Sequence, residues 1–200
     1  MCIRDSNKFD IKFQAVHLFE DEIIEPIEPS PWLVETIKRG ERIGFSSEKS
    51  RSERLVAPIL TELSIINNEA FTIYSGMNIN AGEQDGLNGE CDFMLSFSRI
   101  QDFVIAPIFS ITEAKKQDIE QGTIQCSAQL IAADILNQKD NYPFKTLFGC
   151  STTGTEWRFL KLEGKTITLD ISRYYLTNLN QLLSILQHIV KQANQEYLTF

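Results

Sequence analysis

The sequence has no hydrophobic run long enough to cross a membrane. A transmembrane helix needs about 20 consecutive, predominantly apolar residues, and no apolar stretch of this chain approaches that length. The N-terminal residues also do not show the charged and then apolar order of a secretory leader. We therefore expect a soluble, cytoplasmic protein with no membrane partner.

Histidine is almost absent, and the cysteines form no motif. The two histidines, His17 and His188, lie far apart in the sequence. A zinc site or a Ser-His-Asp triad is therefore hard to build, because one histidine would have to do everything. The four cysteines are scattered without a C-x-x-C pair: Cys2, Cys91, Cys126 and Cys150. Isolated cysteines of this kind are typically reduced and buried, and they pack as small apolar side chains.

The sequence also lacks the basic excess of most nucleic-acid-binding proteins. Its net charge is −8, with 17 acids and 10 bases in residues 1–100 and 10 acids and 9 bases in residues 101–200. Residues 20–28 alone hold five acids and no base. This balance argues against tight DNA binding by the chain alone, because phosphate contacts come chiefly from Lys and Arg.

The most informative stretch runs from Gly89 to Lys115. It contains Asp92 near the start of one predicted strand and Glu113-Ala114-Lys115 at the end of another. Side chains alternate along a strand, so Glu113 and Lys115 share a face. Charged groups on such apolar strands are costly to bury without partners. A divalent cation held by Asp92 and Glu113 would neutralise the carboxylates, and Lys115 beside it would stabilise a developing negative charge.

This arrangement resembles the signature of a known nuclease superfamily. Asp92, followed 21 residues later by Glu113 in the E-x-K triplet, is similar to the bipartite motif of the PD-(D/E)XK nucleases. Three segments resemble an uncharacterised bacterial group related to the N-terminal nuclease domain of type I restriction R subunits: SEKSRSE (47–53), LNGECDF (87–93) and TTGTEW (152–157). The resemblance covers residues 46–190.

The resemblance implies a set of site residues and a cofactor. Asp92 and Glu113 would bind Mg²⁺, with Mn²⁺ as a substitute, and Asp92, Glu113 and Lys115 would form the catalytic trio. The superfamily often adds an acid from an upstream helix, for which Glu53 is favoured and Glu62 stays open. Gln125 matches the auxiliary glutamine of the following helix, although position 129 is Gln where some relatives have tyrosine.

The fold implied is of the mixed α/β (α+β) class, with a restriction-endonuclease-like core in which helices flank a central mixed sheet. Apolar periodicity independently predicts the order helix, three strands, helix, three strands and helix. The predicted helices are 46–67, 118–138 and 178–193, and the predicted strands are 71–79, 92–97, 103–112, 145–150, 157–162 and 166–171. Pro58 suggests a kink in the first helix. Pro107 suggests a bulge, or a strand that begins at Ile108.

Two units are expected in the chain. Residues 46–200 form the nuclease-like domain, and residues 1–45 form an N-terminal appendage in which residues 1–6 look like a sequence scar. The appendage should contain one strand in 9–19, the acidic segment 20–28, and a short helix that starts at Pro31 and is stopped by Gly40. Either a solvated surface or partner binding would explain the acidic segment.

The function expected is that of a Mg²⁺-dependent, endonuclease-like phosphodiesterase acting on DNA, with weak binding by the isolated chain and recognition supplied by a protein partner. Two alternatives stay open. One is a catalytically silent binding or scaffolding module that retains the nuclease fold. The other is a plain α/β domain with a chance E-x-K triplet. The turn Ser151 to Thr155 is a plain turn or a phosphate cradle.

Overall fold

A seven-strand mixed sheet forms the centre of the molecule in this computed structural model, which describes residues 10–81 and 87–200. The strand order is β1-β7-β6-β5-β4-β3-β2, and the two-residue strand β8 pairs with β6. The strands are β1 Lys12–Val16, β2 Thr72–Asn80, β3 Asn88–Ser96, β4 Ile108–Ala114, β5 Thr146–Thr152, β6 Glu156–Glu163, β7 Thr166–Asp170 and β8 Tyr174–Tyr175. Pairing is antiparallel except for β1 with β7 and β4 with β5. The coarse prediction of a mixed α/β fold is confirmed.

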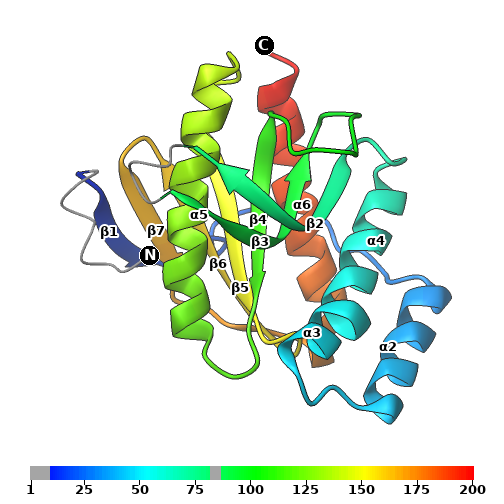
Figure 1. Cartoon of the computed structure of the whole chain (residues 1–200). Coiled ribbons are helices and arrows are strands. Elements are labelled where there is room, and N and C mark those ends of the chain that lie inside the picture. Colours follow the sequence, from blue (N-terminus) through cyan, green and yellow to red (C-terminus); the bar gives the residue numbers. More distant parts are fainter. Residues whose placement is uncertain (1–9, 82–86) are drawn as a thin grey trace.

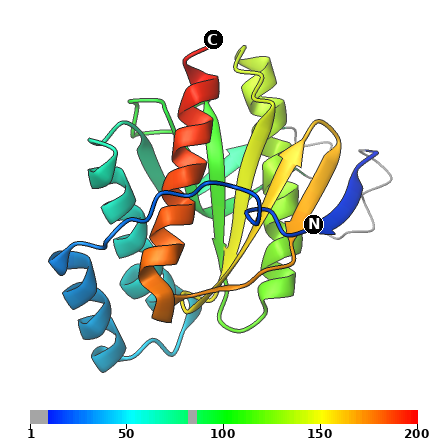
Figure 2. The same cartoon turned by 180° about the vertical axis from the view of Figure 1, so that it is seen from behind.

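Helices cover both faces of this sheet, as the two opposite views show (Figures 1 and 2). Helix α5 lies on one face, and α6 and α4 lie on the other, with α2 packed outside α4. The bounds are α2 Pro31–Ile43, α3 Glu48–Arg51, the π-helical η2 Ser52–Val56, α4 Ala57–Ile66, α5 Ile119–Lys139, the 3₁₀ turn η4 Leu176–Asn178 and α6 Leu179–Tyr197. None of the described helices combines the length and apolarity needed to cross a bilayer.

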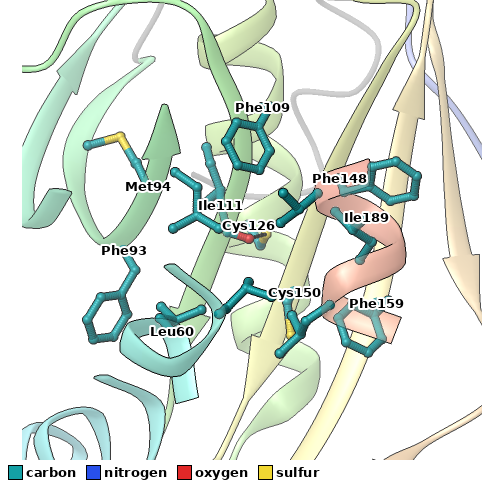
Figure 3. Packing of buried hydrophobic residues seen from close by; sticks show 14 of the residues in the cluster. Leu60, Phe93, Met94, Phe109, Ile111, Cys126, Phe148, Cys150, Phe159 and Ile189 are labelled. Atoms are coloured by element: carbon teal, nitrogen blue, oxygen red, sulfur yellow. Dashed lines mark hydrogen bonds between the residues drawn. The ribbon is translucent and has the colours of Figure 1, made fainter. Parts of the chain in front are cut away.

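The core lies between the sheet and these helices. Leu60 of α4, Ile111 of β4 and Cys126 of α5 are fully buried and come from different layers (Figure 3). Cys91, Cys126 and Cys150 are all buried free thiols, as expected, and burial raises the pKa of the Cys91 thiol to about 12. Cys2 lies outside the described residues, as does the predicted scar of residues 1–6.

The helix predicted from 46 to 67 is present, but it is not uniform. Ser47 caps α3 through a reciprocal hydrogen-bond pair with Ser50, and Asn67 ends α4. The π-helical segment η2 stands between α3 and α4, just before Pro58. Proline has no N–H to donate to the residue four positions earlier, and an irregular turn accommodates that loss.

Two local predictions need correction, and one of two alternatives is decided. Helix α2 does not stop at Gly40 but continues to Ile43, with Gly44 as its C-cap. Gly40 is buried inside the helix, where an added Cβ would lie 3.0 Å from the Arg54 carbonyl oxygen. Asp92 is the fifth residue of β3 rather than its first, because the hairpin pairing continues back to Asn88. Strand β4 begins at Ile108, one of the two outcomes that Pro107 suggested.

The N-terminal residues 10–45 contact the rest of the fold at several places. Strand β1 extends the sheet at β7, and residues 17–30 then cross the outer side of α6 (Figure 2). The Ile27 N–H donates to Ser184 Oγ at 2.8 Å, and Glu25 forms an ion pair with Lys191. At least one acid of the acidic segment, Glu25, therefore pairs with a base of the same chain.

Candidate functional site

The strand register places Asp92 and Glu113 side by side. Phe93 of β3 pairs with Thr112 of β4, so one further step of this antiparallel ladder sets Asp92 opposite Glu113. Opposed residues of an antiparallel pair project from the same face, with Cβ atoms about 5 Å apart. Asp92 Oδ2 also accepts a hydrogen bond from the Ala114 N–H at 2.7 Å. Asp92 therefore lies on the Glu113 side of the sheet, as the nuclease prediction requires.

Lys115 completes the predicted trio. It follows β4 directly, and its Nζ donates to Glu113 Oε1 at 2.7 Å. Its backbone N–H donates to the Thr152 carbonyl of β5 at 2.7 Å, which holds the residue at the end of the two parallel strands. The ammonium is largely buried, and the structure thus brings Asp92, Glu113 and Lys115 together.

The electrostatics reflect two carboxylates in a confined space. Burial raises the pKa of Glu113, and the nearby charge of Asp92 raises it further, against the hydrogen bonds from Lys115 and Gln129. Burial also raises the pKa of Asp92, although the Ala114 N–H and the charge of Lys115 act to lower it. Desolvation acts to lower the pKa of Lys115, but its bond to Glu113 and the surrounding carboxylates outweigh this and raise it. The site therefore holds more negative charge than its one ammonium offsets.

An acid from the upstream helix is present, but it is Glu48. Its Oε1 lies 3.6 Å from Lys115 Nζ, and its charge contributes to the raised pKa of Asp92. Glu48 is the first residue of α3, directly after the Ser47 cap. Its place directly after the cap was the signal that could have identified Glu48 from the sequence. Apolar periodicity shows which face of a helix is buried, but it does not show which end of the helix lies near the sheet.

Neither acid named from the sequence is placed at this site by its contacts. The Glu53 side chain is 59% exposed and pairs with Lys49 at 3.9 Å. Glu62 is 4% exposed and accepts hydrogen bonds from the Ser30 N–H at 2.8 Å and from Ser30 Oγ at 2.9 Å. Glu62 therefore anchors the start of α2, and Glu53 belongs to the surface.

The glutamine that reaches the carboxylates is Gln129 rather than Gln125. Gln129 Nε2 donates to Glu113 Oε2 at 2.9 Å and to the Glu90 carbonyl at 3.2 Å. Gln125 lies one turn earlier on α5 and is half-buried. The helical spacing of four residues put both on one side of α5, but only packing decides which side chain stands over Glu113.

The turn after β5 satisfies its own polar groups. Thr152 Oγ1 donates to the Glu156 carbonyl and accepts from the Gly154 N–H, both at 2.8 Å. Ser151 Oγ donates to the Ile119 carbonyl at 2.9 Å. The two Thr152 bonds hold the turn together and the Ser151 bond joins β5 to α5, which favours the plain turn over a phosphate cradle.

The donor set suits a hard divalent cation. Within residues 10–81 and 87–200, no three His, Cys, Asp or Glu side chains lie close enough to form a metal site by themselves. Mg²⁺, however, commonly binds through one or two carboxylates and keeps several waters. Each oxygen of Glu113 accepts one hydrogen bond, so each keeps acceptor capacity for an ion. Asp92 and Glu113 with added water therefore fit Mg²⁺ or Mn²⁺.

The sequence matches no known protein-family model and no curated protein. The geometry of Asp92, Glu113 and Lys115 is the feature of this chain that points to a chemistry.

Proposed function

We propose that this chain is a Mg²⁺-dependent, endonuclease-like phosphodiesterase that acts on DNA. The observation that carries the proposal is the convergence of Asp92 and Glu113 on adjacent strands, with Lys115 bonded to Glu113. A carboxylate pair that can hold a metal ion, with an ammonium beside it, is suited to phosphodiester hydrolysis, because negative charge develops on the phosphoryl oxygens.

The order of elements around the trio supports the proposal. Helical residues 48–66 precede three antiparallel strands, β2 to β4, and α5 connects β4 to the parallel strand β5. This is a mixed sheet flanked by helices, as the resemblance to PD-(D/E)XK nucleases implies. We therefore include a restriction-endonuclease-like core in the proposal.

Each residue has a distinct part in the proposed reaction. Asp92 and Glu113 would hold Mg²⁺, which would supply Lewis-acid stabilisation of the phosphoryl oxygens. The Ala114 N–H orients Asp92, and Gln129 orients Glu113. In the hydrolysis, a water oxygen bonds to phosphorus and gives up a proton, the bond from phosphorus to the leaving sugar oxygen breaks, and that oxygen takes up a proton. Lys115 stabilises the negative charge that develops during this step.

The net charge of the chain affects its binding to DNA. The net charge of −8 opposes close approach of a polyanion, although Lys49 and Lys116 are exposed near the ends of the site elements. Binding by the isolated chain should therefore be weak and strongly salt-dependent, and a protein partner is proposed to supply recognition.

A specific observation favours the silent binding module as a second candidate. Lys115 is already held between Glu113 and Glu48, and these ion pairs would satisfy the site without any cation. In that case the trio would stabilise the fold, and the protein would bind its partner without cleaving.

Plasmid nicking separates the two candidates. Supercoiled plasmid is incubated with Mg²⁺ or Mn²⁺ and the parent chain, with or without co-purified partners. We expect metal-dependent nicking that falls about 10²- to 10³-fold in Lys115→Met, the size of loss seen for one electrostatic stabiliser. The increase in melting temperature on adding Mn²⁺ should persist in this variant.

Glu53→Gln is the matched control, because Glu53 is an exposed helix acid paired only with Lys49 among the described ion pairs. It should nick at the parental rate. A parent that shows no metal-dependent nicking under any of these conditions would overturn the enzyme proposal and support the silent module.

A further inference from the structure

Strand β2 forms one edge of the sheet, on the side where α4 lies (Figure 1). It is nine residues long and contains no charged residue and no proline. Edge strands are commonly kept from pairing with other chains by charged side chains, by proline or by a covering segment. The composition of β2 provides neither of the first two safeguards, so the strand can accept another one.

A groove of about 540 Å³ lies along this edge. Its lining includes Ile73, Ser75 and Met77 of β2. Ser64 of α4 and Gln101 of the loop between β3 and β4 also line it. The groove therefore follows the first half of β2 and provides space beside its backbone.

Exposed apolar side chains stand next to the groove. Ile65 follows the lining residue Ser64 and is 56% exposed, and Ile100 lies between two residues of the lining and is 44% exposed. The Ile100 carbonyl accepts a hydrogen bond from the Tyr74 hydroxyl at 2.6 Å, which holds this loop against β2. A strand edge bordered by apolar side chains is typical of a surface that another chain covers.

The direction of the backbone groups can be followed across the sheet from β4. Successive residues of a strand direct their N–H and C=O groups alternately to its two sides. The Lys115 N–H donates to a carbonyl of β5, so Ala114 and Thr112 direct their groups to β3. Phe93 is paired with Thr112 and directs its groups to β4, so the next residue, Met94, directs its groups to β2.

The same alternation assigns the outward groups of β2. Tyr74 is paired with Met94 and directs its groups to β3, so Ile73 and Ser75 direct theirs away from the sheet. Within the part of the chain that the structure describes, β2 pairs only with β3. Gly76, with a φ of +62°, interrupts the ladder directly after these residues. Ile73 and Ser75 therefore present backbone donors and acceptors to the groove.

This edge is complementary to a second copy of itself. In an antiparallel pair about a two-fold axis at Tyr74, Ile73 of each copy lies opposite Ser75 of the other, and each such pair can exchange both N–H···O bonds. The lining of the groove holds one acid, Glu69, and one base, Arg99. Two copies of a chain with net charge −8 can therefore approach here without opposing like charges.

We propose that two copies of this chain associate through the outer edge of β2, which joins their sheets into one continuous sheet across a two-fold axis at Tyr74. The inference goes beyond the nuclease proposal and does not depend on it. Backbone hydrogen bonds between Ile73 and Ser75 define the register, and the exposed side chains Ile65 and Ile100 become covered at the joint.

The mass of the chain in solution tests the association. Sedimentation velocity over a dilution series of the parent should show a species of about twice the chain mass of 22.8 kDa. Ser75→Pro should reduce the mass to that of one chain and leave the circular dichroism spectrum unchanged. Proline is tolerated at this point because the Ser75 N–H is not used inside the sheet.

Two further variants separate the loss of pairing from a loss of folding. Ser75→Lys leaves the backbone unaltered, and a lysine on an edge strand opposes pairing, so it should also be monomeric. Ala15→Pro is the matched control on the opposite edge strand, β1. Lys12 and Val16 bond to β7, so Ala15 directs its N–H away from the sheet as Ser75 does. This variant should remain dimeric.

Cross-linking tests the register. A mixture of the variants Ile73→Cys and Ser75→Cys should form a disulfide-linked dimer on mild oxidation. The Cα atoms of a hydrogen-bonded pair are about 5.5 Å apart, within the range of about 4.4–6.8 Å that a disulfide spans. Each variant alone should cross-link no more than the parent does.

A parent that is monomeric throughout the dilution series would overturn the proposal. A dimer that persists in Ser75→Lys and Ser75→Pro, or that is lost in Ala15→Pro, would place the interface elsewhere and overturn it too. Absence of the mixed cross-link would reject the register. None of these measurements uses nicking, so a failure of the nuclease proposal would leave this result standing.

Discussion

Glu113 is restrained on both carboxylate oxygens, by Lys115 on one and by Gln129 on the other. It is 1% exposed, and Asp92 stands beside it on the next strand. In a buried carboxylate pair with one ammonium, protons or a divalent cation reduce the repulsion between the carboxylates. The residue-scale behaviour of this site should therefore depend on pH and on divalent metal.

Asp92→Asn tests that dependence. Asparagine can still accept the Ala114 N–H, but it removes one charge from beside Glu113. We expect the metal-free variant to be more stable than the parent at pH 8 by about 1 kcal/mol, or about 2–4 °C in melting temperature. Mn²⁺ at millimolar concentration should raise the melting temperature of the parent by mass action and leave that of the variant unchanged.

The sign of the pH dependence follows from the raised pKa values. Above the folded pKa of Asp92 and Glu113 both carboxyls are charged and their repulsion destabilises the folded state. Protonation relieves this as pH falls through the folded pKa toward the unfolded value of about 4. The advantage of Asp92→Asn should therefore shrink as the pH falls toward the unfolded pKa. An advantage that grows on acidification would contradict the assignment.

At the scale of elements, the close approach of α5 to β5 depends on Gly122. A Cβ at this position would lie 2.3 Å from Ser151 Oγ and 2.9 Å from Lys115 Cγ. The first turn of α5 can thus lie directly on the residues that follow β4 and end β5. A larger side chain would separate the helix from the strand that positions Lys115.

Gly122→Ala should consequently destabilise the protein, in contrast to the usual effect of replacing a helical glycine by alanine. Alanine in place of glycine inside a helix normally stabilises by about 1 kcal/mol. Here overpacking should instead lower the free energy of unfolding by about 1–3 kcal/mol, as measured by urea denaturation. Gln121→Ala on the exposed side of the same turn should be nearly neutral.

Ser151→Ala provides the internal check of this prediction. It removes the hydroxyl that the new Cβ would meet, so Gly122→Ala should cost less in the Ser151→Ala background. Equal losses in the two backgrounds would show that the Ser151 contact does not limit how closely the helix packs.

At the scale of the whole molecule, residues 10–45 are joined to the remaining fold through paired strands and buried polar contacts. The clearest is Glu62, whose two oxygens accept from the N–H and Oγ of Ser30. Ser30 Oγ in turn accepts from the Leu33 N–H at the start of α2. Removing Glu62 would leave polar groups of this helix start without their charged acceptor.

Glu62→Ala should therefore lower the free energy of unfolding by about 2–4 kcal/mol, whereas Glu53→Ala should change it by less than about 0.5 kcal/mol. Both are helix acids of the same chain segment, so each serves as the reference for the other in chemical denaturation. Plasmid nicking by folded Glu62→Ala should match the parent. A large loss of nicking with normal stability would instead show that Glu62 takes part in the reaction.

The sequence by itself determined the elements and the central trio. Alternating and helical apolar patterns depend on local periodicity, and they placed the last two helices to within a few residues of their observed bounds. Asp92, Glu113 and Lys115 could be named because the E-x-K triplet and its spacing from Asp92 resemble the PD-(D/E)XK signature, and strand alternation places Glu113 and Lys115 on one face.

Only the tertiary structure decided which helix residues meet that trio. Glu48 and Gln129 approach it because α3 and α5 dock at particular depths and rotations, and Glu53 and Gln125 on the same helical segments do not make these contacts. The same holds for Gly40, which looked like a helix stop and is a packing contact with Arg54. Docking is set by contacts between residues distant in sequence, which no local pattern contains.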